Sequence, residues 1–140
     1  MGDESRLDIG SEHDILTARQ RGRELAEQVG FSGSDLTILA TAISEIARNI
    51  VQYAGRGRIT LRAVDEGEHR GLVVVATDEG PGIPDVTLAM QDGYSTGRSL
   101  GLGLPGAKRL MDEFDLDSQA GRGTTVTMKK WITSPSARVH

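Results

Sequence analysis

The sequence has 140 residues, a formal net charge of −4 at pH 7 and no cysteine. The length suits one domain with a substantial hydrophobic core, and the lack of cysteine excludes disulfides, thiolate metal sites and cysteine nucleophiles. A negative charge without a long Lys/Arg block argues against nucleic-acid binding. No apolar run reaches the ~18 residues of a membrane span, so we expect one cytoplasmic domain over residues 1–140, with its core at about 6–131 and a disordered tail at 132–140.

The first elements expected along the chain are a short strand and two helices. Leu7 and Ile9 alternate with polar neighbours, which predicts the strand. Ser11 and the acidic residue three positions later resemble a capping box, and the helical pattern that follows stops at Gly30. The stretch SDLTILATAISEIARNIVQYAG, residues 34–55, has one apolar stripe and predicts a buried central helix.

Two hairpins account for most of the remaining chain. RITLRAV with GLVVVATD predicts the first, and FDLDSQA with TTVTMKKW, joined by GRG, predicts the second. Residues 79–100 predict a loop-rich connection with a short helix around DVTLAMQ, followed by a helix from about Leu104 to Asp112. This order is not the strand–helix alternation of a doubly wound fold. It predicts a two-layer α/β sandwich with a mixed, mostly antiparallel sheet and its helices on one face.

Glu45 and Asn49 are one helical turn apart on the strongest predicted helix, so their side chains are neighbours. Carboxylate and amide oxygens are hard ligands that suit Mg²⁺, and only the carboxylate can also act as a base. The pair therefore indicates a site where a metal is held beside a general base. An incidental pair on a solvated helix face is the alternative.

Asp78 ends an apolar strand and is followed by EGPGIP. A carboxylate at a strand end can accept a hydrogen bond from an exocyclic amine such as N6 of adenine, and Gly80 and Gly82 would let the base lie close to the backbone. Thr124, within GRGTT, could place a hydroxyl near the edge of the same base. The alternatives are an ordinary Asp-x-Gly turn and a tight hairpin turn.

Gly101, Gly103 and Gly106 have the spacing of a dinucleotide-binding fingerprint. That fingerprint should follow a strand directly, whereas Gly101 follows a long polar loop. The backbone amides of Leu102, Gly103 and Leu104, at the start of a helix, would instead form an anion site. A plain helix start is the alternative.

In combination and in this order, ISEIARNIVQYA, DEGPGIP, GLGLPGAKRL and GRGTTV resemble the N, G1, G2 and G3 boxes of the GHKL, or Bergerat-fold, ATPases, which include histidine kinases and DNA gyrase. The resemblance covers about residues 6–131 and implies an ATP-binding fold with a short lid at residues 83–100. The boxes are most similar to those of the serine/threonine switch kinases of stressosome systems. Arg48 and Tyr53 differ from what anti-sigma-factor kinases usually carry, so that role comes second.

The resemblance implies ATP and Mg²⁺ as ligands and assigns roles within four groups of residues. Asn49 would coordinate Mg²⁺; Glu45 would be the general base; Asp78, Gly80, Gly82 and Thr124 would bind adenine; Gly101, Leu102, Gly103, Leu104 and Gly106 would surround the phosphates.

The implied reaction is phosphorylation of Ser or Thr in a STAS-domain antagonist protein. The implied second partner is a PP2C-type phosphatase that the released kinase binds and activates. Two other classes stay open from the sequence: an anti-sigma factor that sequesters a sigma factor, and a dinucleotide-dependent oxidoreductase.

Overall fold

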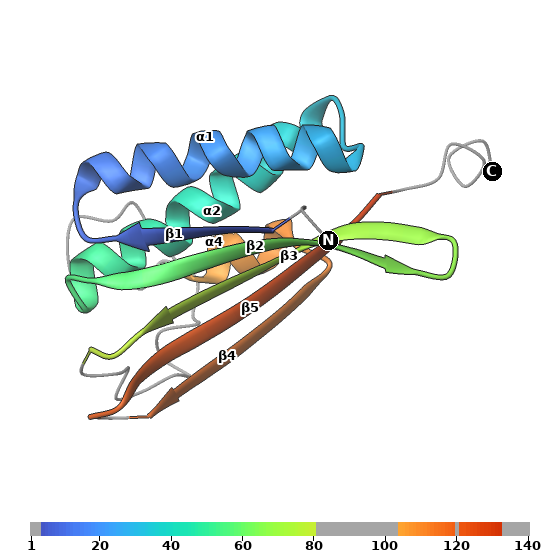
Figure 1. Ribbon diagram of the computed structural model, residues 1–140. Coiled ribbons are helices and arrows are strands. Elements are labelled where there is room, and N and C mark those ends of the chain that lie inside the picture. Colours follow the sequence, from blue (N-terminus) through green and yellow to red (C-terminus); the bar gives the residue numbers. More distant parts are fainter. Residues whose placement is uncertain (1–3, 81–103, 120, 133–140) are drawn as a thin grey trace.

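The computed structural model describes residues 4–80, 104–119 and 121–132, and it is a two-layer α/β sandwich (Figure 1). The elements in chain order are β1 (Glu4–Ile9), α1 (Glu12–Val29), α2 (Ser34–Tyr53), β2 (Gly57–Glu66), β3 (His69–Asp78), α4 (Leu104–Leu110), β4 (Glu113–Gln119) and β5 (Gly123–Trp131). The strands form one sheet in the order β1-β2-β3-β5-β4. The helices cover one face of it, as predicted, and every described strand pair is antiparallel.

The first helix begins and ends where the capping signals place it. The Ser11 hydroxyl accepts a hydrogen bond from the backbone N–H of Asp14 at 3.4 Å, and the Asp14 carboxylate accepts one from the N–H of Gly10 at 2.8 Å. The reciprocal bond of a capping box thus reaches one residue further back than usual. At the other end, Gly30 has a φ of 125°, which glycine adopts without strain.

The hydrophobic core lies between the sheet and α2. Leu39, Ile43, Ile46 and Ile50 form the apolar stripe of α2, and all four are almost fully buried. A side chain at Gly22 of α1 would overlap Ile43, so this glycine lets the two helices approach closely. Truncating a buried Ile or Leu of this kind to Ala costs about 2–5 kcal/mol, so the stripe contributes a large share of the stability.

Two element boundaries differ from the predictions for identifiable reasons. The last helix ends at Leu110 rather than Asp112. Asp112 instead joins β5, because its N–H donates to the Lys129 carbonyl oxygen at 3.0 Å and its carboxylate accepts from the Trp131 N–H at 2.7 Å. The first hairpin is longer than predicted because its turn is confined to the residues around Gly67, which has a φ of 65°.

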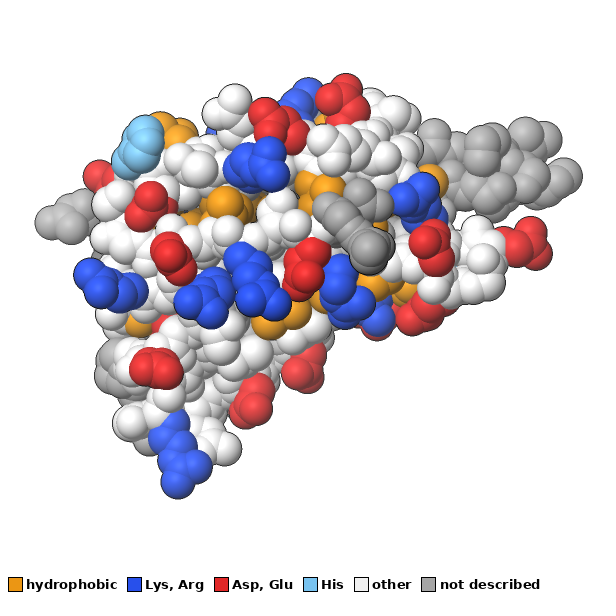
Figure 2. Space-filling model, in the orientation of Figure 1, with side chains coloured by type: hydrophobic (Ala, Val, Ile, Leu, Met, Phe, Trp, Pro, Cys, Tyr) orange, Lys and Arg blue, Asp and Glu red, His pale blue; other side chains and the backbone are white. Residues whose placement is uncertain are grey.

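The sheet face that the described helices leave open is polar. Arg6, Arg58 and Arg62 project from it on β1 and β2, and Figure 2 shows Lys and Arg side chains in a row across the molecule with Asp and Glu between them. None of the helices in the described residues is both long enough and apolar enough to cross a bilayer. The predicted helix around DVTLAMQ, the predicted lid at 83–100 and most of the tail lie outside the described residues.

A glycine at the start of β5 allows an unusually close approach to the end of β3. Gly123 has a φ of 114°, and a Cβ at this position would overlap the Asp78 carbonyl oxygen. We expect Gly123→Ala to lower the free energy of unfolding by about 2–4 kcal/mol, because it combines backbone strain with a steric overlap. Urea unfolding followed by circular dichroism measures this. Gly121→Ala is the matched control: its φ is 80° but its Cβ would meet nothing, so a loss as large as that of Gly123→Ala would show that the overlap is unimportant.

Candidate functional site

The sheet brings two predicted site residues together, Asp78 at the end of β3 and Thr124 at the start of β5. They are directly opposite each other in the register of these strands. Thr124 is buried, and its hydroxyl lies 2.8 Å from the hydroxyl of Ser118 on β4. Ser118 was not predicted from the sequence; its signal is its position opposite Thr124 in the second hairpin.

Asp78 is half-buried and uses one carboxylate oxygen to form the turn that follows it. Its Oδ1 accepts a hydrogen bond from the N–H of Gly80 at 2.9 Å. The Asp-x-Gly turn considered as an alternative therefore exists. It does not exclude the predicted binding role, because among the described residues no hydrogen bond occupies the second oxygen, Oδ2.

Gly80 joins this turn to the end of α2. A Cβ at Gly80 would lie 2.6 Å from the Cβ of Ala54, so only glycine lets the backbone pack so closely there. Asn49 and Glu45 lie five and nine residues before Ala54 on α2. At 1.5 Å per residue, these positions are about 7.5 Å and 13.5 Å back along the helix axis. The packing of Gly80 on Ala54 thus joins the turn after Asp78, where the base is predicted to bind, to the helix that carries Asn49 and Glu45.

Glu45, Arg48 and Asn49 form a half-buried polar group on α2. Arg48 Nη1 donates a hydrogen bond to Glu45 Oε2 at 3.1 Å, and the Glu45 side chain is only 13% exposed. Burial raises the pKa of Glu45 above its usual value, and the charge and hydrogen bond of Arg48 offset part of this. A carboxyl whose pKa moves toward neutrality is suited to exchanging a proton.

Asn49 has the properties of a magnesium ligand. Its side chain is half-buried and has no hydrogen-bond partner within the described part of the chain, so its amide oxygen is available. In these same residues, no group of three or more His, Asp or Glu is placed to hold a metal. Mg²⁺ commonly uses one or two protein oxygens together with substrate phosphates and water, so a single amide ligand fits this ion.

The final predicted group is only partly described. Leu104 is the first residue of α4, as predicted, and both Leu104 and Gly106 are buried. Gly82 and the stretch from Gly101 to Gly103, which includes Leu102, lie outside the described residues, so their predicted contacts stay predictions.

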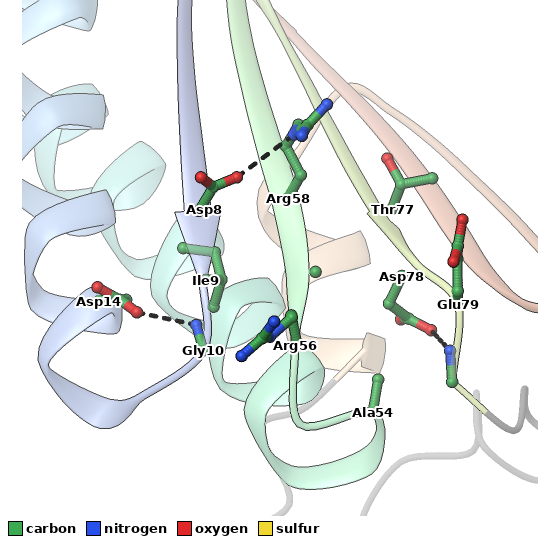
Figure 3. A pocket seen from close by; sticks show the side chains of 12 residues that line it. Asp8, Ile9, Gly10, Asp14, Ala54, Arg56, Arg58, Thr77, Asp78 and Glu79 are labelled. Atoms are coloured by element: carbon green, nitrogen blue, oxygen red, sulfur yellow. Dashed lines mark hydrogen bonds and ion pairs between the residues drawn. The ribbon is translucent and has the colours of Figure 1, made fainter.

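A cavity of about 870 Å³ opens where β1, β2 and β3 meet the end of α2 (Figure 3). Asp78 and Gly80 line it, whereas Glu45, Asn49 and Thr124 do not. Arg56, which the sequence did not single out, also lines it, and its guanidinium reaches toward Gly10 (Figure 3). Of the described residues predicted to bind the base, the cavity therefore includes Asp78 and Gly80 but not Thr124.

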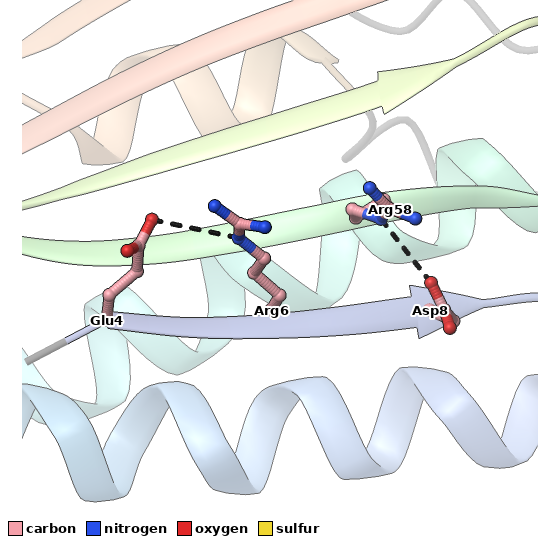
Figure 4. A network of polar contacts seen from close by, with 4 residues as sticks. All are labelled: Glu4, Arg6, Asp8 and Arg58. Atoms are coloured by element: carbon pink, nitrogen blue, oxygen red, sulfur yellow. Dashed lines mark hydrogen bonds and ion pairs between the residues drawn. The ribbon is translucent and has the colours of Figure 1, made fainter. Parts of the chain in front are cut away.

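An ion pair occupies part of the rim of this cavity, and a second pair on β1 lies outside its lining. Arg58 Nε lies 3.5 Å from Asp8 Oδ1, and further along β1 Arg6 Nε lies 3.9 Å from Glu4 Oε2 (Figure 4). Exposed pairs of this kind contribute about 0–1 kcal/mol to stability. Because Asp8 and Arg58 neutralise each other, the remaining carboxylates leave this end of the site net acidic, with Arg56 as a counter-charge; these carboxylates are Asp14, Asp78 and Glu79.

A substitution at Gly80 tests how the turn and the helix are joined. We expect Gly80→Ala to weaken ATP binding by about tenfold or more, because the added methyl group must push the turn away from Ala54 and displace Asp78. Isothermal titration calorimetry measures this. Gly67→Ala in the first hairpin is the control, since its Cβ would meet nothing, and equal ATP affinity in all three proteins would contradict the assignment.

Comparison with known proteins supports the predicted family. The family model described as "Histidine kinase-like ATPase domain" matches residues 11–130. "Serine/threonine-protein kinase RsbT" of Bacillus subtilis (strain 168) is 51% identical over 132 residues, which are 94% of this chain and 99% of the relative. "Anti-sigma F factor" of Thermoanaerobacter sp. (strain X514) is 32% identical over 115 residues, 78% of this chain and 79% of that protein.

Solved structures support the fold. The mycobacterial sensor histidine kinase MprB superposes with a TM-score of 0.54 at 22% identity, over 91% of this chain and 97% of its own. The catalytic domain of histidine kinase ThkA superposes with a TM-score of 0.51 at 14% identity, over 90% and 95%. The resemblance to the GHKL ATPases is confirmed: the chain belongs to the family of histidine kinase-like ATPase domains.

Proposed function

We propose that this chain is an ATP-dependent protein-serine/threonine kinase of a partner-switching stress-response pathway. The relationship to RsbT bears out the expectation of a serine/threonine kinase, since identity is 51% over almost the full length of both chains. The structural observation that carries the proposal is the packing of Gly80 on Ala54. It fixes the acidic end of β3, where adenine would bind, against the helix that carries the proposed base and metal ligand.

The proposed chemistry needs three functions from the chain's own residues. Asp78 binds the adenine N6 amine through Oδ2, with Thr124 at the neighbouring edge of the base. Asn49 would hold Mg²⁺, which when bound draws charge from the phosphates. Glu45 accepts the proton of the incoming hydroxyl. The hydroxyl oxygen forms a bond to the γ-phosphorus, the bond from that phosphorus to the β–γ bridging oxygen breaks, and ADP leaves with the electron pair.

Catalysis in this scheme depends mainly on positioning and charge. Phosphoryl transfer requires little covalent participation by the protein, and well-oriented reactants supply about 7–11 kcal/mol of barrier reduction. Mounting the base and the metal ligand one turn apart on a buried helix provides that fixed orientation.

The proposed substrate is a STAS-domain antagonist protein within a cytoplasmic stressosome, and the proposed second partner is a PP2C-type phosphatase activated by the free kinase. Both follow from the resemblance to switch kinases. One relative is named a serine/threonine-protein kinase and another an anti-sigma factor. The two names together support a partner-switching role.

Transfer of label from γ-labelled ATP tests the proposal directly. We expect label on a Ser or Thr of a cognate STAS-domain protein, and none on the same protein with that residue changed to Ala. Label appearing only as free phosphate, in the presence of a folded STAS protein, would contradict the kinase assignment.

An anti-sigma factor is the second candidate function. The 32% identity to an anti-sigma F factor over 78% of this chain favours it. Stable, ATP-dependent co-purification with a sigma factor, without transfer of label to a STAS protein, would establish this function in place of the first.

A further inference from the structure

Among the described residues, Arg48 is the charged group that interacts with the proposed base, and the ion pair between them is partly shielded from water. Arg48 Nη1 lies 3.1 Å from Glu45 Oε2, and the two residues are three positions apart on α2. The Glu45 side chain is 13% exposed and that of Arg48 is 41% exposed, so the carboxylate lies inside while the guanidinium reaches outward. Arg48 is the hydrogen-bond partner of Glu45 among the described residues.

The other described charged groups on elements near α2 are either exposed to solvent or bonded to residues other than Glu45. Those of α1 are exposed except Asp14, which is bonded to Gly10. The charged residues of α4, Lys108 and Arg109, are exposed. On the helix-covered face of the sheet, Asp78 accepts a hydrogen bond from the Gly80 N–H, and Arg70 is paired with Asp65. On the same face, the Lys130 ammonium donates to the Leu110 carbonyl oxygen at the end of α4. In the described part of the chain, Arg48 is thus the charge that acts on Glu45.

We propose that Arg48 is a positioning residue for phosphoryl transfer: its hydrogen bond fixes the Glu45 carboxylate in one orientation and keeps it ionised despite burial. This rests on the proposed role of Glu45 as the base. A buried carboxylate without a partner would take up a proton and could not accept another from a substrate hydroxyl. Arg48 is suited to the task because it cannot lose its own charge and its planar guanidinium holds a carboxylate oxygen in a defined direction.

The alternative contacts of Arg48 make different predictions. A residue that binds ATP phosphates would change nucleotide affinity when removed. A residue that contacts the protein substrate would change the KM for that substrate. A residue that keeps Glu45 ionised changes the pH dependence of kcat and leaves both affinities unaltered.

The experiment compares wild type, Arg48→Met, Arg48→Lys and the control Arg62→Met, whose side chain is exposed on the open face of β2. For Arg48→Met we expect the acidic limb of the kcat profile to move up by about 0.5–1 pH unit, less than for a fully buried pair because Arg48 is partly exposed. At pH values on the acidic side of this limb, the kcat of Arg48→Met should then be about 3–10-fold lower than that of wild type. Arg48→Lys, which keeps the charge, should restore most of the profile, and Arg62→Met should match wild type.

A second readout does not depend on activity. Carbon-13 NMR titration of the Glu45 carboxyl in the protein without nucleotide should show a higher midpoint in Arg48→Met than in wild type. Identical midpoints and identical acidic limbs would overturn the proposal, as would a loss of ATP affinity or a raised substrate KM with an unmoved limb. Full transfer activity in Glu45→Gln would instead refute the base assignment in the proposed function, whatever the Arg48 variants do.

Discussion

Glu45→Gln is expected to reduce kcat for phosphoryl transfer by about 10²–10⁴-fold, the usual contribution of a positioned general base. Glutamine has nearly the same size and can still accept a hydrogen bond from Arg48, but its amide cannot take a proton. Because Glu45 is nine residues from the Ala54 end of α2, where Asp78 lies, ATP affinity should stay within about twofold of wild type. Single-turnover transfer to the STAS protein and calorimetric ATP binding provide the two measurements.

Glu27→Gln is the matched control, since Glu27 is an exposed glutamate near the end of α1. Its kcat should equal that of wild type. A Glu45→Gln protein that transfers phosphate at the wild-type rate would eliminate Glu45 as the base. One that loses ATP binding and transfer together would show that the residue supports the nucleotide site instead.

The pH dependence of stability gives an independent check on Glu45. Burial raises its pKa in the folded chain, so the folded state binds this proton more tightly than the unfolded state does. The resulting stabilisation is present below the unfolded pKa and is lost as the pH rises through the higher folded pKa. Glu45→Gln, which is neutral at all pH values, should therefore lack this decline in melting temperature with rising pH. A wild type and variant whose melting temperatures change in parallel through this range would contradict the raised pKa.

The sequence could predict the architecture because its signals are local. The α2 stripe repeats at helical spacing, Ser11 and Gly30 delimit α1, and both hairpins carry alternating apolar residues around glycine turns. These features depend on near neighbours in the chain, so they survive folding unchanged. The end of the last helix was wrong because Asp112 bonds to β5, a contact that arises only when the sheet forms.

The candidate site was predictable as residue types but not as an arrangement. The sequence indicated that Glu45 and Asn49 are neighbours because one helix carries both. The register between Asp78 and Thr124 and the packing of Gly80 on Ala54 both join parts of the chain that are far apart in sequence. Arg48 and Glu45 are three residues apart, so the sequence places them near each other on one helix. Only the three-dimensional structure shows the distance between their charged groups and how far Glu45 is shielded from water.

Asp78→Asn is expected to weaken ATP binding strongly, because the turn at Gly80 fixes which atom of the new side chain faces the adenine amine. In wild type, the Gly80 N–H donates to Oδ1 and leaves Oδ2 for the adenine amine. In the variant, the single amide oxygen satisfies Gly80, so the NH₂ group faces the N6 amine and two donors meet. Hydrogen bonds to charged groups contribute about 1.5–3 kcal/mol, so ATP affinity should fall about 10–100-fold.

Inosine triphosphate, which carries a carbonyl oxygen in place of N6, should bind the variant at least as well as it binds wild type, because the new NH₂ can donate to that oxygen. Asp115→Asn on the exposed edge strand β4 is the control and should leave both affinities unchanged. If Asp78→Asn weakens the two nucleotides equally, the carboxylate shapes the pocket without recognising the amine, and the orientation proposed for the base is wrong.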